Sequence, residues 1–154
     1  MRILVLSDSH SRLVDDIKFN KYDFVIHCGD YGNSYEILKN NNVIFVRGNC
    51  DYQGDNERII TINNKKILIL HGDLYNVKYD YIRLTYKGEA CGANIVFFGH
   101  THRQDLYELN NIMYINPGSY NYGDYIEIID DKIIFYQNER VVKKQDFRWW
   151  LIWH

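Results

Sequence analysis

The stretch RILVLSDSH, residues 2–10, joins an apolar run to polar side chains that are common metal ligands. Ile3 to Leu6 is typical of a buried β-strand, and Asp8 and His10 follow where that strand would end. In open α/β sheets, ligands bind at the carboxyl ends of the parallel strands. This one stretch therefore predicts an α/β fold with a functional site at its strand ends.

The same pattern, an apolar run followed by Asp, Asn or His, occurs four more times. The later runs are Phe24 to Ile26, Val43 to Val46, Ile67 to Leu70 and Ile95 to Phe98, and the polar residues after them are Asp30, Asn49 with Asp51, His71, and His100 with His102. Parallel strands of one sheet would bring all of these side chains to the same edge. We therefore expect them to form one cluster.

The chemistry of these side chains favours a metal site. Carboxylate, imidazole and amide oxygen, without paired thiolates, suit borderline-hard divalent ions such as Mn²⁺, Fe²⁺ or Zn²⁺. Seven ligands are too many for one tetrahedral ion, but they suit two adjacent ions that share a carboxylate. Two ions about 3.5 to 4 Å apart are a known device for in-line displacement at phosphorus. The residues alone thus predict a hydrolase of phosphate esters.

Five short motifs closely resemble those of the calcineurin-like metallophosphoesterases. They are Asp-Ser-His at 8–10, Cys-Gly-Asp at 28–30, Gly-Asn-Cys-Asp at 48–51, His-Gly-Asp at 71–73 and Gly-His-Thr-His at 99–102. Asn-Pro-Gly-Ser at 116–119 also matches a turn of the small bacterial and archaeal phosphodiesterase branch. The resemblance implies a four-layer αββα sandwich, with two mixed β-sheets flanked by helices and a metal site at the carboxyl ends of the strands.

The resemblance also implies the metal ligands. Carried over position by position, one ion is bound by Asp8, His10, Asp30 and His102, and the other by Asp30, Asn49, His71 and His100. Asp30 is then the bridge. The expected cofactor is two divalent ions, Mn²⁺ first, with Fe²⁺, Zn²⁺ or Ni²⁺ as alternatives. Hydroxide formed from water between the ions would be the nucleophile.

One position departs from the wider family. Many members have His directly after the Gly-Asn pair, and that His is thought to protonate the leaving group or hold the phosphate. Here the position is Cys50, followed by Asp51. A thiol with a reference pKa of about 8.5 is a poor substitute for an imidazole at about 6.5. Because the small phosphodiesterase branch shares this form, we take Asn49, Cys50 and Asp51 as the catalytic candidates and leave the general acid open.

Taken singly, several of these residues have ordinary structural explanations. Asp8 could cap a helix, and Asp30 could belong to a turn. His27 lies inside an apolar strand, one residue out of register with the site, so we expect a core histidine there. Arg12 and Arg103 are each near a predicted ligand; a surface position is favoured, and a contact to a phosphate oxygen is the alternative.

Strands alternate with helices in the first half of the chain, and hairpins follow. Strands are predicted at 2–7, 23–28, 43–47, 57–62, 65–70, 94–98, 105–115 as a meander, 124–129 and 132–136, and helices at 34–40 and 76–90, with a weak helical pattern at Leu13 and Ile17. Asn63-Asn64 and Asp130-Asp131 fit tight hairpin turns.

Length and composition exclude several classes of protein. The 154 residues, 46% of them hydrophobic, fit one compact domain over 1–154. A net charge of -2 gives no general basic surface for duplex nucleic acid. The first apolar run is far shorter than a signal-peptide core or the about 20 residues of a spanning helix, so no membrane partner is expected. Three cysteines without framework spacing favour reduced thiols in the cytoplasm.

The tail at about 138–154 is both basic and aromatic. Its cations are Arg140, Lys143, Lys144 and Arg148, and its apolar residues are Phe147, Trp149, Trp150, Leu151, Ile152 and Trp153. We interpret the cations as a solvated face. The aromatic cluster is expected to pack on its own domain, and a homo-oligomer surface is the alternative.

Three functions from different classes follow. The favoured one is a metal-dependent phosphodiesterase that acts on a small-molecule phosphate ester. The second is a phosphomonoesterase or nucleotide hydrolase on the same site. The third is a non-catalytic scaffold, because a eukaryotic retromer subunit is similar to this branch and works through protein contacts. That subunit lacks one ligand histidine, whereas all seven positions are filled here.

Overall fold

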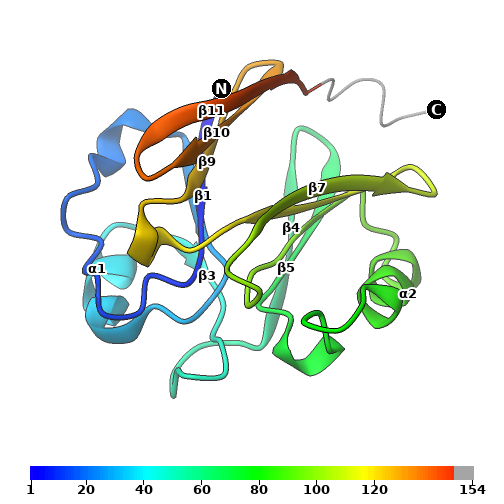
Figure 1. Ribbon diagram of the computed structural model, residues 1–154, viewed down its shortest axis with the longest axis horizontal. Coiled ribbons are helices and arrows are strands. Elements are labelled where there is room, and N and C mark those ends of the chain that lie inside the picture. Colours follow the sequence, from blue (N-terminus) through cyan, green and yellow to red (C-terminus); the bar gives the residue numbers. More distant parts are fainter. Residues whose placement is uncertain (148–154) are drawn as a thin grey trace.

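Two mixed β-sheets form the centre of the computed structural model, which describes residues 1–147 (Figure 1). The first sheet has the order β11-β10-β9-β1-β2-β3, with bounds β1 Arg2–Leu6, β2 Phe24–His27, β3 Ile44–Phe45, β9 Tyr125–Ile129, β10 Lys132–Gln137 and β11 Arg140–Asp146. The second has the order β4-β5-β6-β8-β7, with bounds β4 Glu57–Ile62, β5 Lys65–Leu70, β6 Ile95–Phe97, β7 Gln104–Leu109 and β8 Ile112–Pro117. Parallel pairing is confined to β1-β2-β3 and β5-β6-β8.

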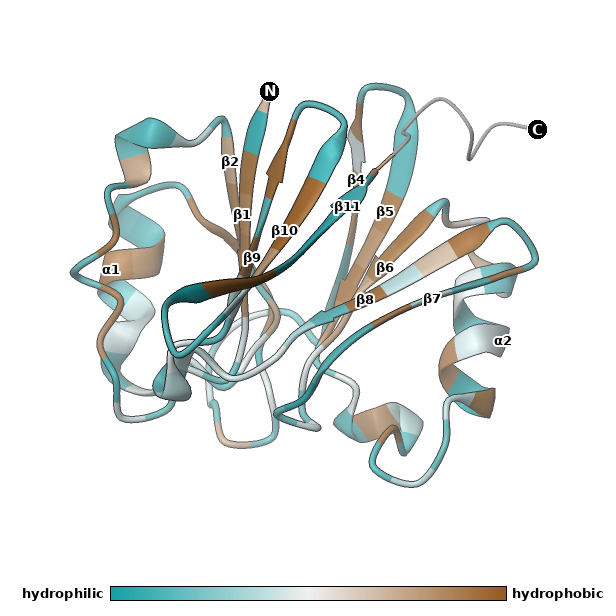
Figure 2. Ribbon diagram, turned by 45° about the horizontal axis from the view of Figure 1, so that its top comes forward, coloured by the Kyte–Doolittle hydropathy of each residue, from teal (hydrophilic) through white to brown (hydrophobic). Residues whose placement is uncertain are grey.

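Helices cover the outer face of each sheet, which confirms the predicted αββα sandwich. Helix α1 (Tyr35–Asn40) lies against the first sheet, and α2 (Ile82–Ala90) lies against the second (Figures 1 and 2). Short 3-10 turns at Phe19–Lys21, Gly32–Ser34, Asp73–Tyr75 and Tyr120–Tyr122 connect the strands. The described residues form three apolar clusters: one between the sheets and one under each helical layer.

The central strands are apolar on both faces, because both faces are covered. In β1, Ile3 and Val5 pack between the sheets, whereas Leu4 and Leu6 face the α1 layer. Strand β5 does the same: its alternate residues join the inter-sheet cluster and the cluster beneath α2. Two-sided burial explains why these strands are continuous apolar runs in the sequence rather than alternating patterns.

The predicted helix over 76–90 begins only at Ile82. Asn76 has a left-handed backbone with a φ of 58°, which interrupts any helix there. Val77 and Tyr81 nonetheless pack in the cluster under α2. The spacing of these apolar residues therefore arises from their burial and not from a helical backbone. The weak helical pattern near Leu13 and Ile17 was also wrong, since those two residues belong to neither a helix nor a 3-10 turn.

Strand β11 was not predicted. The segment pairs antiparallel with β10 at the edge of the first sheet, and most of its side chains are exposed. The solvated face expected for Arg140, Lys143 and Lys144 is therefore correct, although it belongs to a strand. Phe147 is fully buried between the sheets, as expected for packing on its own domain. Arg148 and the three tryptophans of the tail lie outside the described residues.

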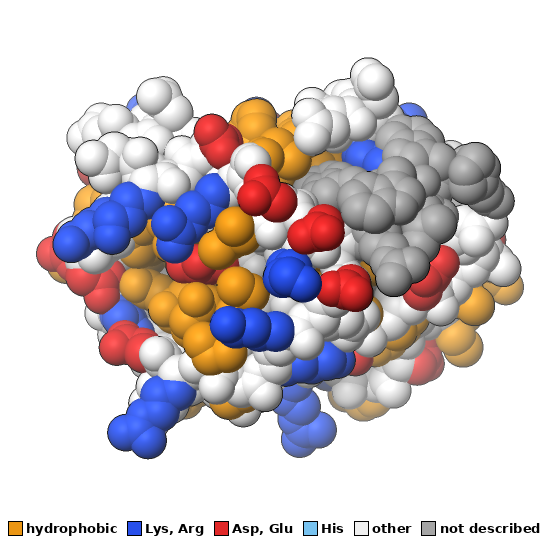
Figure 3. Space-filling view, turned by 90° about the horizontal axis from the view of Figure 1, so that it is seen from above, with side chains coloured by type: hydrophobic (Ala, Val, Ile, Leu, Met, Phe, Trp, Pro, Cys, Tyr) orange, Lys and Arg blue, Asp and Glu red, His pale blue; other side chains and the backbone are white. Residues whose placement is uncertain are grey.

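The turns between β4 and β5 and between β9 and β10 lie at the end of the molecule where the N-terminus lies, opposite the carboxyl ends of the parallel strands (Figure 1). Asn63 and Asn64 both have positive φ, as their predicted turn requires. Figure 3 looks onto this end and shows Lys and Arg side chains interspersed with acidic and apolar ones. Among the described residues, we find no helix with the length and apolarity needed to cross a membrane.

Candidate metal centre

The predicted ligands come from the strand ends of both sheets. Asp8, Asp30 and Asn49 follow β1, β2 and β3 of the first sheet, whereas His71 and His100 follow β5 and β6 of the second. The expectation that a single sheet would gather these residues was therefore wrong. They meet because the two packed sheets present their carboxyl ends at the same end of the molecule.

The donor atoms of all seven predicted ligands converge. The closest pairs are His10 Nε2 to His102 Nε2 at 3.1 Å, His102 Nε2 to Asp8 Oδ1 at 3.2 Å, His71 Nε2 to Asn49 Oδ1 at 3.0 Å, and His71 Nε2 to His100 Nδ1 at 3.2 Å. Two donors bound to one ion at about 2.0 to 2.2 Å lie about 2.8 to 3.1 Å apart at right angles and about 3.3 to 3.6 Å apart at tetrahedral angles. The spacing of the donors therefore fits a shared ion.

The donors form groups whose atoms lie within 4.8 Å of one another. His10 and Asp30 form one such group with Cys50. The two groups that contain predicted ligands alone are Asp8, His10 and His102, and Asp30, His71 and His100. The Asp30 carboxylate lies between them, because its Oδ2 is 3.2 Å from His71 Nε2 and 3.7 Å from His10 Nε2. Asp30 thus lies within reach of donors from both groups.

Asp8 gives an independent indication that the centre fits a cation. Its side chain is fully buried, and Oδ2 accepts hydrogen bonds from Ser7 Oγ at 2.6 Å and from the His100 N–H at 3.0 Å. Its Oδ1 is buried, and no described residue donates to it in hydrogen-bond geometry, although His102 Nε2 lies 3.2 Å away. A buried oxygen of this kind is costly unless a donor or a cation meets it. The residues therefore fit a divalent metal ion.

The carboxylates of the centre are charged near neutral pH. Burial acts to raise the pKa of Asp30, but the hydrogen bond and charge of His71 outweigh it and lower the pKa to about 2. Burial likewise opposes ionisation of Asp8, yet the interaction with His102 keeps its pKa below the ordinary value. Conversely, Asp30 and Asp8 overcome the effect of burial on His71 and raise its pKa to about 8. A cation that binds here must displace that proton.

Five of the ligands have a left-handed backbone. The φ angles are 52° for Asp8, 44° for His10, 58° for Asp30, 72° for His100 and 61° for His102. Residues with a Cβ rarely adopt this conformation, and each one costs free energy. The sharp turns that follow the strands thus place the side chains inward at the expense of backbone strain.

Two glycines allow the strand-end loops to approach the carboxylates. A Cβ on Gly48 would lie 2.2 Å from Asp30 Oδ1, and one on Gly99 would lie 2.6 Å from Asp8 Oδ2. Both distances are far shorter than a van der Waals contact. Any larger residue at Gly48 or Gly99 would therefore push a carboxylate out of the centre.

Asp51 binds backbone rather than facing an imidazole. Its carboxylate accepts N–H bonds from Asp30 at 2.7 Å, Tyr31 at 3.1 Å and Gly48 at 2.7 Å. These bonds join the loop after β2 to the loop after β3. Burial raises the pKa of Asp51. Its observed contacts make it a residue that positions Asp30.

Cys50 is exposed at the edge of the centre. Its backbone N–H donates to Asp30 Oδ1 at 2.9 Å, and its sulfur lies within 4.8 Å of donor atoms of His10 and Asp30. Burial and the Asp30 charge raise the pKa of the thiol, so the thiol keeps its proton near neutral pH.

The Asn-Pro-Gly-Ser turn supports the centre from behind. Asn116 is fully buried; its Nδ2 donates to the Gly99 carbonyl at 3.1 Å and to Thr101 Oγ1 at 3.0 Å. Ser119 Oγ donates to the Asp8 carbonyl at 2.8 Å. The motif matched in the sequence thus holds the loops that carry Asp8 and the His-Thr-His ligands.

His27 is a buried histidine, as predicted, and it also supports the site. The Gly29 N–H donates to its Nδ1 at 3.1 Å, so Nε2 carries the proton and donates to Ser9 Oγ at 2.9 Å. Ser9 stands between Asp8 and His10, and Gly29 precedes Asp30. Sequence reasoning missed this contact, which joins the two ligand loops of the first sheet.

Acidification should act on stability through His27. Burial lowers its pKa from 6.5 to about 3. Between these two pH values the unfolded chain binds a proton that the folded chain excludes. The free energy of unfolding therefore decreases as the pH is lowered from 6.5 to about 3. One such group can lower the free energy of unfolding by at most about 1.4 kcal/mol per pH unit. Urea unfolding in EDTA at pH 6 and pH 4 should show a steeper loss for the wild type than for His27→Gln. Equal slopes would contradict this assignment.

The two arginines near the ligands differ. Arg12 pairs with Asp16 and Glu139 and lies 4.1 Å from the centre of the Tyr120 ring. These contacts fit the favoured surface position rather than a contact to a phosphate oxygen. Arg103 is exposed, and its guanidinium forms no ion pair with any residue that the structure describes.

Comparison with known proteins agrees with this geometry. Residues 1–125 match the model of the calcineurin-like phosphoesterase superfamily domain. The chain belongs to that superfamily. Among calcineurin-like relatives, a probable metallophosphoesterase of Bacillus subtilis is 34% identical over 127 residues, which cover 77% of this chain and 75% of the relative. A phosphodiesterase of Methanocaldococcus jannaschii is 29% identical over 144 residues, covering 77% of this chain and 83% of its own length.

Solved structures show the same calcineurin-like fold. A predicted phosphoesterase of Streptococcus pneumoniae is 25% identical, with a TM-score of 0.79 over 95% of this chain and 96% of its own. Vps29 of Entamoeba histolytica, solved with Zn²⁺, has a TM-score of 0.79 at 23% identity and covers 96% of this chain and 100% of its own. The superfamily uses divalent metals, in line with the donor groups described above.

Proposed function

We propose that this chain is a phosphodiesterase that depends on two divalent ions. The convergence of seven donor side chains around the unsatisfied Asp8 oxygen carries the proposal. In the proposed assignment, Asp8, His10, Asp30 and His102 hold one ion and Asp30, Asn49, His71 and His100 hold the other. When bound, the two ions supply an ionised water near neutral pH and a hold on the phosphate oxygens.

Side chains at the edge of the centre would stabilise the phosphoryl oxygen and protonate the leaving group. Asn49 is exposed and has its Oδ1 toward His71; one N–H of its Nδ2 donates to Cys50 Sγ at 3.5 Å, and the other is available to the charge that develops on a phosphoryl oxygen. The Cys50 thiol is a weak acid with a raised pKa, and it donates a proton poorly to a leaving group. We therefore propose that substrates with stable leaving groups react fastest.

Metal preference follows from the ligands. Four imidazoles and three oxygen donors favour Mn²⁺, Fe²⁺, Zn²⁺ or Ni²⁺ over Mg²⁺, which prefers oxygen and retains its water. We propose Mn²⁺ as the working ion. The three cysteines are free, which supports a reducing compartment such as the cytoplasm.

Removal and replacement of metal test the proposal. Treatment with EDTA should abolish hydrolysis of bis(4-nitrophenyl) phosphate, and Mn²⁺ should restore it more readily than Mg²⁺. Hydrolysis of 4-nitrophenyl phosphate, measured beside it, separates a diesterase from a monoesterase. Faster turnover of the monoester would favour the alternative of a phosphomonoesterase or nucleotide hydrolase.

A scaffold is the second candidate, because the fold also matches Vps29. A Vps29 was itself solved with Zn²⁺, so metal binding alone does not separate the two candidates, and ester hydrolysis does. Absence of hydrolysis for every ester at saturating metal would favour the scaffold.

A further inference from the structure

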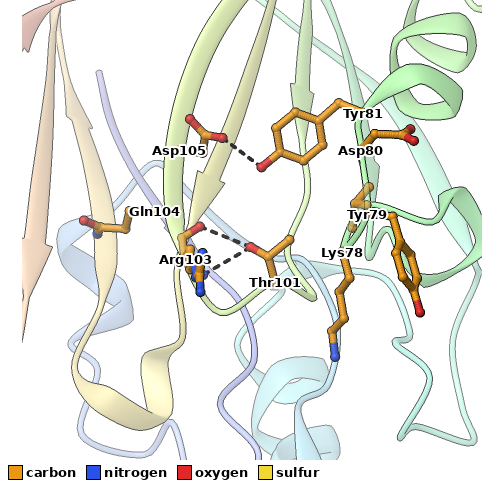
Figure 4. Close-up of a pocket in the computed structure, with 9 residues that line it drawn as sticks. Lys78, Tyr79, Asp80, Tyr81, Thr101, Arg103, Gln104 and Asp105 are labelled. Atoms are coloured by element: carbon orange, nitrogen blue, oxygen red, sulfur yellow. Dashed lines mark hydrogen bonds between the residues drawn. The ribbon is translucent and has the colours of Figure 1, made fainter.

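A groove of about 650 Å³ is lined by sequence neighbours of the predicted ligands His100 and His102 (Figure 4). One wall is the segment 77–81 before α2, and the other is the loop 101–105 that leads into β7. Thr101 lines the groove and stands between the ligands His100 and His102. Molecules bound in the groove would therefore lie beside the reacting phosphate.

Two unpaired cations line this groove. Neither the Lys78 ammonium nor the Arg103 guanidinium forms an ion pair or a side-chain hydrogen bond with any described residue, and both lie with Thr101 at one end of the groove (Figure 4). By contrast, Lys87 on α2 pairs with Glu57 at 2.7 Å. Cations without a protein partner beside a site are available to an anionic ligand.

The carboxylates of the groove do not neutralise these cations. Asp105 accepts the hydroxyl of Tyr81 at 2.8 Å, and Asp80 accepts the N–H of Ile82 at 3.0 Å. Figure 4 shows both carboxylates away from the end where Lys78 and Arg103 lie. The positive charge is thus concentrated beside the metal centre.

We infer that the groove binds one ester substituent of the substrate and selects a substituent that carries a phosphate of its own, such as a phosphorylated nucleoside. This inference rests on the proposed phosphodiesterase function. The groove has the volume of a pocket for a small organic ligand. Lys78 and Arg103 supply the charge for a second phosphate. Tyr79, whose side chain is 83% exposed, supplies an aromatic face for a base.

Two substrates that differ by one phosphate test the inference. They are thymidine 5′-(4-nitrophenyl phosphate) and the same ester with a 3′-phosphate. The wild type should have the higher kcat/KM for the phosphorylated ester, by about tenfold or more, as expected for charge-assisted contacts. The double substitution Lys78→Ala with Arg103→Ala should reduce this preference toward one, mainly through KM.

A matched control removes a cation outside the groove. Arg83 is exposed on α2, and Arg83→Ala should leave the preference unchanged. Equal kcat/KM values of the wild type for the two esters would overturn the inference. So would an equal loss for both esters in the double variant, because the two cations would then act on the reacting phosphate.

Binding separates this inference from the proposed function. Thymidine 3′,5′-bisphosphate should bind the metal-free wild type in EDTA, measured by calorimetry. The double variant should bind it about tenfold more weakly, whereas Arg83→Ala should not. If the wild type binds the bisphosphate but hydrolyses no ester, the proposed phosphodiesterase function is refuted and the inference about the groove stands. If the wild type does not bind the bisphosphate, the inference about the groove is refuted.

Discussion

Asp30→Ala is expected to lose both metal ions and at least about 10³-fold of the phosphodiesterase activity. The reason is geometric: the Asp30 carboxylate lies between the two donor groups, near both His71 and His10. Among the described residues of the two groups, Asp8 is the other carboxylate, and the imidazole nearest to its Oδ1 is His102 at 3.2 Å, with His71 at 3.8 Å. Asp8 Oδ1 is farther from His71 than Asp30 Oδ2 is, so Asp8 is the poorer bridge.

Metal content by mass spectrometry measures this expectation directly. His10→Ala is the matched control, because His10 is assigned to one ion alone in the proposed scheme; it should weaken that ion, and excess metal should restore activity. Asp30→Asn keeps an acceptor for the Cys50 N–H and tests whether the charge itself matters. Equal metal stoichiometry in the wild type and Asp30→Ala would contradict the assignment of two ions.

Cys50→His should raise the turnover of esters with alkoxide leaving groups by about 10²-fold or more near neutral pH. The sulfur of Cys50 lies near donor atoms of both His10 and Asp30, so an imidazole introduced there would be close to the reacting phosphate. It would titrate near neutral pH, whereas the pKa of the present thiol is raised above its ordinary value. A positioned acid would thus replace one that keeps its proton.

Aryl phosphodiesters are the internal control for Cys50→His, because their leaving groups need little protonation and their turnover should change little. Cys50→Ser and Cys50→Ala should be nearly silent with either class of ester. A large loss in Cys50→Ala would show that the thiol takes part in binding or proton transfer, and an increase in bound metal in Cys50→His would show that the new imidazole serves as a ligand.

The metal centre could be predicted because its information is local. Asp8, Asp30 and His71 each follow their own strand within a few residues, so each strand end can be recognised without knowledge of the others. The sequence could not show that these strands belong to two sheets. The apolar runs of β1 and β5 are alike, and pairing partners are not encoded in periodicity.

Supporting contacts and the groove were beyond prediction, because they join distant segments. The carboxylate of Asp51 reaches the backbone of Asp30, and the walls of the groove around Lys78 and Arg103 lie more than twenty positions apart in the chain. Strand β11 could not be predicted for another reason. It is an edge strand with most of its side chains in solvent, so its sequence has no apolar period. Of the described residues in this part of the chain, Phe147, directly after the strand, has the burial that marks a core residue.

The left-handed backbone of the five ligands has a consequence for the evolution of this protein. A residue with a Cβ pays about 1 to 2 kcal/mol in this conformation, and Asp pays less than most. Five such residues together approach the net stability of a whole domain, about 5 to 15 kcal/mol. Glycine at any of these positions would relieve the strain and delete a ligand. Under selection for stability alone, lineages of this protein would drift toward a more robust fold with an eroded centre, so only continued selection for metal binding preserves these conformations.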